Sequence, residues 1–251
     1  MSKSKGSTSK RQTIREKRRQ QQRQRRLYTI LIITLAALVV AGLLIAPSIR
    51  NALTPVGEIK NITPRNYPMV DGKTLGDPSA PVKVEVYEDF QCPSCRTFSN
   101  EIEPLIVDNY VATGTIQIIF RHFPFLDDRA AGKESDQSAN ASMCAADQGR
   151  FWDYKDILFA NWDGENQGAF SDKRLVAFAQ TLGLDMEAFQ ACFESNRFQE
   201  VIDEDLAAGR NAGVSGTPSI FVNGEHVTPG FVPSYIQLSQ AIEAALGSSS
   251  N

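Results

Sequence analysis

Two cysteines, Cys92 and Cys95, are the residues whose type and spacing most directly indicate chemistry in this chain, and they lie in the stretch DFQCPSC. A Cys-x-x-Cys pair occurs as half of a zinc site, as a short structural disulfide, or as the reactive pair of a thiol–disulfide exchange centre. The three uses need different surroundings, so the sequence around the pair decides among them.

A zinc site needs two further ligands at a suitable spacing. The other two cysteines, Cys144 and Cys192, are isolated in the sequence, and the two histidines, His122 and His226, lie far from both. We therefore expect no metal and no other cofactor. A purely structural bridge within the pair stays open as an alternative, although so short a loop removes little entropy from the unfolded chain.

The residues on either side of the pair predict a strand that leads into a helix. Residues 82–90, VKVEVYEDF, alternate valine with polar residues and are rich in β-branched and aromatic types, which is the pattern of a strand. After Cys92, Pro93 suits the first turn of a helix, and apolar residues recur at helical spacing up to residue 106.

This setting gives the two cysteines different properties. Cys92 lies at the helix N-terminus, where unpaired N–H groups and the helix dipole stabilise a thiolate and lower its pKa. Cys95 lies one turn later on the same face, so a disulfide between the two opens and closes with little movement. We expect Cys92 to lie near solvent as the attacking sulfur, and Cys95 to face the interior as the resolving sulfur.

The remaining pattern predicts an α/β domain with a block of helices in its middle. Residues 115–123 form a second strand, which makes a strand–helix–strand unit with a parallel pair. Helical segments punctuated by glycines and capping residues follow from about 130 to 212. Residues 219–224, SIFVNG, restore the strand pattern with an Asn-Gly hairpin turn, and a final amphipathic helix spans roughly 233–246.

The N-terminal residues differ in charge from the rest of the chain. Residues 1–26 contain eleven Lys or Arg and one acid, Glu16, which gives +10 and leaves −13 for everything after them. Residues 27–49 carry no charge over 23 positions, enough to cross a hydrocarbon layer about 30 Å thick as a helix. The apolar run is longer than that of a signal peptide, and Pro47 falls where cleavage would occur, so we expect an uncleaved anchor.

Positive residues stay on the cytoplasmic side of a membrane, so we expect a single-pass protein of the cell membrane with its catalytic part extracytoplasmic. Residues 1–26 are expected to be a basic, disordered cytoplasmic tail. A contact with anionic lipid stays open, but no nucleic-acid partner is expected, because no aromatic residue precedes Tyr28. Residues 50–74 are expected to form a semi-extended linker, residues 75–247 the domain, and residues 248–251 a disordered end.

Four stretches together resemble one known family. VKVEVYEDFQCPSC, followed about 120 residues later by GVSGTPSIFVNG, resembles the thioredoxin superfamily, specifically its DsbA-like thiol:disulfide oxidoreductases. RHFPF and CAADQGRFWDYKDILF strengthen the resemblance, which covers roughly residues 75–246. It implies a thioredoxin-like α/β fold with an inserted α-helical domain, here preceded by one transmembrane helix.

The resemblance also implies roles for individual residues. Pro218 matches a proline that is cis and lies beside the active cysteines, and Thr217 would bind a substrate peptide through its main chain. The residue before the second cysteine tunes acidity in this family, and here it is the uncharged Ser94. A buried carboxylate often found six residues before the first cysteine is replaced by Val86. The acids near that position, either proton carriers or simply solvent-exposed, are Glu85, Glu88 and Asp89.

If Cys92 and Cys95 form the redox pair, Cys144 and Cys192 are left to each other. They lie about fifty residues apart in the predicted helical block, where a structural disulfide would contribute on the order of 4 kcal/mol. Two buried free thiols, or a second redox pair that relays electrons to the first, are the alternatives.

The function that these observations favour is an extracytoplasmic oxidase that introduces disulfides into secreted or membrane proteins. The resemblance implies that a quinone-linked membrane oxidase, of the DsbB or vitamin-K-epoxide-reductase (VKOR) type, would reoxidise it. A thiol reductase, for instance in cytochrome maturation, stays open because the sequence does not fix the reduction potential. A non-catalytic peptide-binding or chaperone module is the third possibility.

Overall fold

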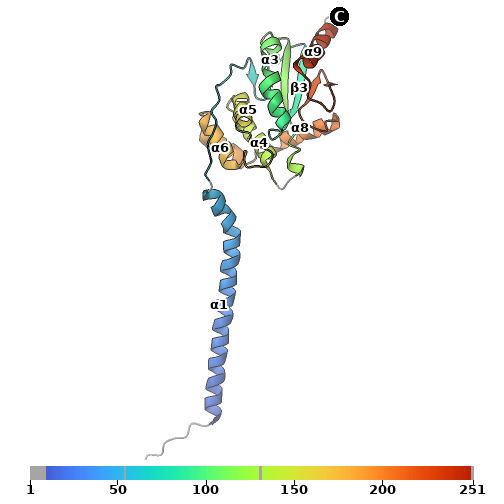
Figure 1. The fold of residues 1–251 in the computed structure, drawn as a ribbon. Coiled ribbons are helices and arrows are strands. Elements are labelled where there is room, and N and C mark those ends of the chain that lie inside the picture. Colours follow the sequence, from blue (N-terminus) through green and yellow to red (C-terminus); the bar gives the residue numbers. More distant parts are fainter. Residues whose placement is uncertain (1–9, 54, 130–131, 250–251) are drawn as a thin grey trace, which may run out of the picture. The chain divides into compact units, whose positions relative to one another are not determined.

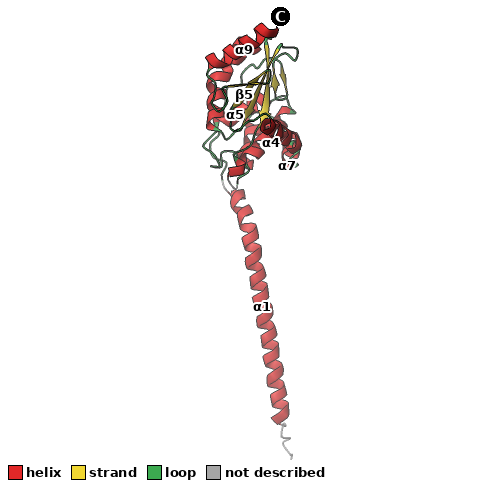
Figure 2. Ribbon diagram, turned by 90° about the vertical axis from the view of Figure 1, so that its right-hand side faces the viewer, coloured by secondary structure: helices red, strands yellow, loops and turns green. Residues whose placement is uncertain are grey.

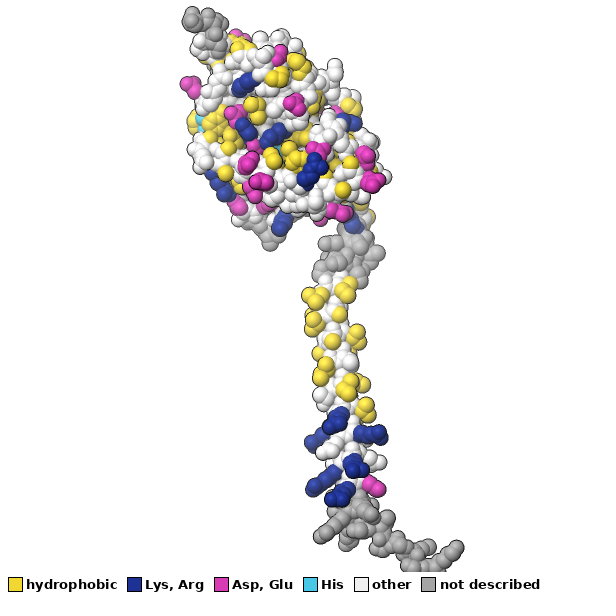
Figure 3. Space-filling model, turned by 180° about the vertical axis from the view of Figure 1, so that it is seen from behind, with side chains coloured by type: hydrophobic (Ala, Val, Ile, Leu, Met, Phe, Trp, Pro, Cys, Tyr) yellow, Lys and Arg dark blue, Asp and Glu magenta, His cyan; other side chains and the backbone are white. Residues whose placement is uncertain are grey.

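The chain divides into two units between Pro55 and Val56, and the described part of the first consists of helix α1 (Lys10–Leu53) and Pro55 (Figure 1). The computed structural model describes residues 10–53, 55–129 and 132–249. Within the helix, residues 15–46 are long and apolar enough to cross a membrane by length and composition. Figure 3 shows apolar side chains around the later part of this helix, with Lys and Arg gathered on its earlier part.

The predicted disordered tail is helical where the structure describes it. Residues 10–26 belong to α1, whereas residues 1–9 lie outside the described residues. No Gly or Pro interrupts the segment, and Arg, Lys, Gln and Glu are strong helix formers, so the tail continues the helix of the apolar run.

The described residues of the second unit form a six-stranded sheet with the order β1-β2-β4-β3-β5-β6. The strands are β1 (Val70–Asp71), β2 (Thr74–Leu75), β3 (Val82–Glu88), β4 (Ile116–His122), β5 (Ser219–Val222) and β6 (Glu225–Val227). β3 and β4 are parallel, with Val86 opposite Phe120, and the other neighbouring strands are antiparallel. The two longest strands therefore lie side by side at the centre and end in the same direction.

Helices cover the sheet on both sides (Figure 2). The segment after Cys92 consists of α2 (Pro93–Thr97), η1 (Phe98–Ile102), α3 (Glu103–Ile106) and η2 (Val107–Val111). The later helices are η3 (Asp127–Arg129), α4 (Glu134–Ala146), α5 (Phe151–Ala160), α6 (Asp172–Thr181), α7 (Met186–Glu194), α8 (Gln199–Asn211) and α9 (Tyr235–Ser249). The predicted α/β architecture with a helical insertion is thus confirmed.

The helix after the cysteine pair widens twice into a π-helical turn, at η1 and η2. Pro104 lies in the first turn of α3, directly after η1. Proline donates no backbone hydrogen bond, and its ring clashes with the carbonyl group four residues earlier, so the turn before it widens.

The two faces of the sheet bury different sets of side chains. Alternate residues of β3, including Val84 and Val86, belong to the main core together with residues of α5 and α9. The opposite face carries a small cluster of Tyr87, Phe123, Val214 and Phe221. Because the side chains of a strand alternate between faces, a residue of β3 can be assigned to one face by its number alone.

In contrast to the linker expected over residues 50–74, residues 56–69 belong to the second unit and pack against the rest of it, and we call them the strap. Arg174 Nη1 donates to the Val56 carbonyl at 2.8 Å. The Asn161 side chain accepts from Lys60 N at 2.8 Å and donates to Lys60 O at 2.9 Å. Residues 70–75 then form the antiparallel pair β1 and β2, in which β2 pairs with β4 and β1 is the edge strand of the sheet.

The strap also contributes side chains to the core. Ile59, Ile62 and Tyr67 pack against buried residues, and the Tyr67 hydroxyl donates to the Asp156 carboxylate at 2.9 Å. The strap is extended and its partners lie far away in the sequence, so no local periodicity marks it. At the other end of the unit, α9 includes residues 248 and 249 of the predicted disordered end, and residues 250–251 lie outside the described residues.

Removing the strap is expected to destabilise the second unit. A chain that begins at residue 75 lacks β1, the first of the two residues of β2 and the strap side chains, whereas one that begins at residue 56 keeps them. Burial of two or three apolar side chains is worth about 3 kcal/mol or more, so the shorter chain should unfold at a clearly lower urea concentration. Equal midpoints in urea titrations of the two chains would contradict a structural role for the strap.

Candidate active site

Cys92 and Cys95 lie where β3 ends and α2 begins. Cys92 is the N-cap residue of α2, and Cys95 is fully buried within its first turn, whereas Cys92 is 7% exposed. Both thiols are free, so the structure represents the reduced state. Cys92 is less exposed than the sequence predicted, because Thr217 lies against it: Cys92 Sγ donates to the Thr217 carbonyl at 3.2 Å.

The segment that approaches Cys92 contains a cis peptide bond between Thr217 and Pro218. β5 begins at the next residue, and its first residue, Ser219, lies opposite Tyr87 of β3. This antiparallel register brings the residues before β5 to the end of β3 from which the cysteine loop departs. The fold thereby joins two segments that are more than a hundred residues apart in the sequence.

The surroundings give the two thiols opposite acidities. A hydrogen bond from the Cys95 thiol is the largest cause that lowers the pKa of Cys92 to about 6. The backbone N–H groups of Cys95 and Ser94 act in the same direction, and burial opposes them. Burial is the main cause that raises the pKa of Cys95 well above its ordinary value. At neutral pH the reduced pair therefore carries one thiolate, on Cys92.

The low pKa of Cys92 predicts a pH dependence of its alkylation that can be tested. Alkylation of the reduced protein by iodoacetamide should be half-maximal near pH 6, since the reagent reacts with the thiolate of Cys92. Cys95→Ala should move the midpoint upward, because it removes the largest cause of the lowered pKa. The lowered pKa also stabilises the reduced fold, fully above the ordinary thiol pKa of 9.0 and progressively less as the pH falls from there through 6. A wild-type midpoint near 9 would contradict this description.

Of the three acids proposed near the pair, Glu88 lies on the buried face of β3 toward the cysteines. It follows Val86 by two residues and therefore shares its face. It is 2% exposed, and neither carboxylate oxygen has a hydrogen-bond partner among the described residues. Burial raises its pKa to about 8, the Lys155 charge opposes this, and a thiolate on Cys92 adds to it. The two-residue alternation of the strand is the sequence signal that places Glu88 on this face.

The other two acids have structural partners. Glu85 lies on the opposite face, where its carboxylate accepts from Arg121 Nε at 2.9 Å. Asp89 accepts from Gln91 N at 2.9 Å and from Leu126 N at 3.1 Å, and burial raises its pKa to about 7. The Asp89 carboxylate therefore holds the loop that leads to Cys92, and Glu85 belongs to an ion pair.

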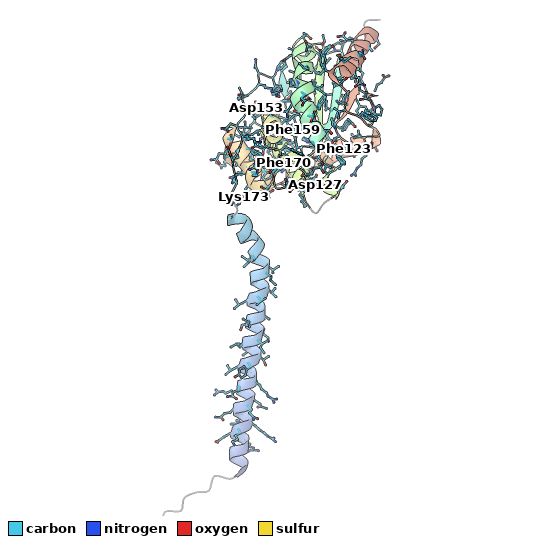
Figure 4. All side chains as sticks on the ribbon, in the orientation of Figure 1. Phe123, Asp127, Asp153, Phe159, Phe170 and Lys173 are labelled. Carbon is cyan, nitrogen blue, oxygen red and sulfur yellow. A yellow bond between two sulfur atoms is a disulfide. The ribbon has the colours of Figure 1, made fainter. Side chains whose placement is uncertain are left out.

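Sequence reasoning missed the residues that tie the cysteine loop to the helical insertion. Trp162 Nε1 donates to the carbonyl of Gln91 at 2.6 Å, and the Arg96 guanidinium lies 5.6 Å from the Trp162 ring centre. Arg96 Nε also donates to the carbonyl of Phe159, whose position is marked in Figure 4. These partners lie some 60 to 70 residues apart, so no local pattern revealed them.

The remaining cysteines and histidines lie on elements other than β3 and α2. Cys144 of α4 and Cys192 of α7 are joined by a disulfide inside the helical insertion. His122 ends β4 and is buried, and burial lowers its pKa to about 3, so its imidazole is neutral. His226 of β6 stacks on Phe221 with ring centres 4.4 Å apart.

Comparison with known proteins agrees with this site. A family model described as thioredoxin matches residues 69–244. "Probable disulfide bond formation protein D" of Bacillus cereus is 30% identical over 163 residues, covering 63% of this chain and 73% of that protein. "Disulfide bond formation protein D" of Bacillus subtilis is 27% identical over 183 residues, covering 71% and 79%.

A solved structure gives the same relation. The crystal structure of oxidised BdbD from Bacillus subtilis matches with a TM-score of 0.63 and 25% identity, over 74% of this chain and all of that one. The predicted thioredoxin-like fold is confirmed. The chain belongs to the thioredoxin superfamily, and within it to the DsbA-like thiol:disulfide oxidoreductases.

Proposed function

We propose that this protein is a membrane-anchored, extracytoplasmic oxidase that introduces disulfides into secreted or membrane proteins through Cys92 and Cys95. The observation that carries the proposal is the asymmetry of the pair, an acidic Cys92 thiol beside a fully buried Cys95. A lowered Cys92 pKa stabilises the reduced form and makes the disulfide a stronger oxidant. For a fall from 9.0 to about 6, the gain at pH 7 is about 30 mV.

The proposed reaction is two successive thiol–disulfide exchanges. A substrate thiolate attacks Cys92 Sγ, the Cys92–Cys95 bond breaks, and Cys95 departs as a thiolate that takes up a proton. A second substrate thiolate then attacks the substrate sulfur of the mixed disulfide and releases the Cys92 thiolate. The substrate loses two electrons to the cysteine pair, and its two thiol protons are released or taken up by the pair.

Glu88 is the group that we propose gives the proton to Cys95. Cys95 is fully buried, so its thiolate has no direct contact with water. Glu88 lies on the same buried face and interacts electrostatically with both cysteines. In the return direction its carboxylate accepts the Cys95 proton, so Glu88 serves the role that a carboxylate at position 86 would serve in related proteins.

Thr217 and Pro218 are the proposed binding site for the substrate main chain. The Thr217 carbonyl lies 3.2 Å from Cys92 Sγ, so a peptide whose cysteine is bonded to Cys92 would extend along residue 217. Strand-like pairing with this segment would bind clients through their backbone, independently of most side chains. The same segment would bind the reoxidising partner, proposed to be a quinone-linked membrane oxidase of the DsbB or VKOR type.

A stoichiometric oxidation tests the proposed function. The oxidised full chain in detergent is mixed with an equal amount of a reduced, unfolded protein that contains two cysteines. We expect one substrate disulfide to form for each Cys92–Cys95 pair that becomes reduced, as counted by alkylation and mass spectrometry. A substrate that stays reduced while the protein stays oxidised would contradict an oxidase, as would the reverse transfer from reduced protein to an oxidised substrate.

A further inference from the structure

The helical segment that follows the cysteine pair carries polar side chains on its buried face. Cys95, Ser99 and Glu103 follow one another at intervals of four residues, and their exposed fractions are 0%, 1% and 4%. Residues four apart in a helix share a face. Ser99 and Glu103 therefore continue the face of the resolving cysteine into the core.

Lys155 of α5 meets this face from the helical insertion. It is fully buried, and its Nζ donates to Ser99 Oγ at 2.6 Å and to the Glu103 carboxylate. The ammonium also lies over the rings of Trp152 and Phe159, at 5.5 Å and 5.4 Å from their centres. Well-packed apolar residues often replace such a buried ion pair without loss of stability. Stability alone is therefore a poor explanation for this one.

Glu88 is the third ionisable group of the cluster. The positive charge of Lys155 favours its ionised form, and the negative charge of Glu103 opposes it, with Lys155 having the larger effect. Because Glu88 itself makes no hydrogen bond with the described residues, these two charges, a thiolate on Cys92 and burial set its affinity for a proton. His122, opposite Glu88 on β4, is buried and neutral. A change in either partner should therefore alter proton exchange with Cys95.

We propose that Lys155 and Glu103 are positioning residues for proton transfer at Cys95, in which the Lys155 ammonium keeps Glu88 able to release and recover a proton near neutral pH. Glu103, together with Ser99, fixes the ammonium in place. The inference rests on the proposed role of Glu88. It gives the helical insertion a part in the chemistry, since α5 supplies a charge to a redox centre built by β3 and α2.

The affected step is the attack of Cys95 on a mixed disulfide. The Cys95 proton moves to the Glu88 carboxylate, Cys95 Sγ attacks Cys92 Sγ, and the sulfur bonded to Cys92 leaves as a thiolate. Two electrons pass to the leaving partner, and a Cys92–Cys95 disulfide is formed. Oxidised glutathione supplies the mixed disulfide in the experiment.

The test follows this step in the reduced full chain in detergent, mixed with oxidised glutathione at pH values from 5 to 9. Acid quenching, alkylation and mass spectrometry measure how fast the Cys92–glutathione intermediate disappears. We expect Lys155→Met to raise the pH midpoint of this rate by one unit or more, and Glu103→Gln to lower it. Opposite shifts from the two members of one ion pair are a result that mere loss of stability does not produce.

A double variant and a matched control complete the design. Lys155→Met/Glu103→Gln removes both charges of the ion pair, so neither member is left without its partner, and should have a midpoint above the wild type but below Lys155→Met. It also supplies the readout if Lys155→Met alone does not fold. Lys73→Met breaks another buried ion pair, with Asp205 on the opposite face of the sheet, and should leave the midpoint unchanged.

Glu88→Gln separates the possible failures. This variant should abolish the pH dependence of the rate at which the intermediate disappears. If the rate instead follows the wild-type pH profile, the proposed role of Glu88 is wrong and the inference fails with it. If Glu88→Gln abolishes the pH dependence while Lys155→Met, Glu103→Gln and the double variant follow the wild-type pH profile, only the role of Lys155 and Glu103 is overturned. A shift in Lys73→Met of the same size as in Lys155→Met would also overturn it.

Discussion

Cys92→Ser should reduce thiol–disulfide exchange to the uncatalysed rate, whereas Cys95→Ser should trap the protein as a mixed disulfide with its substrate. Cys95 is left in the first variant, but it is fully buried and its raised pKa keeps it protonated, so no client sulfur reaches a reactive thiolate. In the second variant Cys92 still reacts, and no neighbouring sulfur releases the substrate.

Both outcomes are measured on non-reducing gels after alkylation of free thiols. Incubation of Cys95→Ser with an oxidised client should give a covalent complex that dithiothreitol dissolves, and Cys92→Ser should give none. Cys92→Ser/Cys95→Ser is the matched control for non-specific disulfides. Retention of exchange activity in Cys92→Ser would contradict the division of roles between the two sulfurs.

Cys144→Ala/Cys192→Ala should lower the free energy of unfolding by about 4 kcal/mol, since the disulfide closes a loop of 48 residues. This is a large share of the 5–15 kcal/mol that typical domains have. The bond joins α4 to α7, and the helical insertion also presents Trp162 and Lys155 to the redox centre. The variant should nevertheless retain exchange at temperatures where it remains folded.

Guanidinium titrations of the two proteins measure this effect, with the wild type kept oxidised at Cys144 and Cys192. The mild reductant that opens Cys92–Cys95 should leave the buried second bond intact, which alkylation and mass spectrometry can show. Unchanged stability together with lost oxidase activity would contradict a structural bridge and would instead favour electron relay between the two pairs.

Local patterns predicted the elements that build the redox centre. Neighbours within a few residues determine three of these features: the alternation in residues 82–90, the proline after Cys92 and the Asn-Gly turn at 223–224. The local sequence was therefore enough to predict them. The position of Glu88 was also available from the strand period, because it shares a face with Val86. The sequence could not predict that Glu88 is buried without a hydrogen-bond partner, since this depends on which residues pack over the strand.

The features that the sequence did not reveal depend on distant partners. The strap carries no periodicity because Asn161 and Arg174, about a hundred residues away, satisfy its backbone. Lys155 in an amphipathic helix is typically a solvent-facing residue, and its burial follows only from the meeting of α5 with Ser99 and Glu103. The pattern of charged and apolar residues along one element does not predict which residues of another element it will contact.

The reduction potential of the Cys92–Cys95 pair tests the central claim, that the pair acts as an oxidant. The full chain in detergent is equilibrated in buffers of reduced and oxidised glutathione, quenched with acid, alkylated, and counted by mass spectrometry. The proposed oxidase function predicts a value toward the oxidising end of the superfamily, near about −120 mV, and the acidic Cys92 thiol shifts the potential in that direction by about 30 mV. A value near the thioredoxin end, about −270 mV, would contradict the oxidase assignment and identify a reductase.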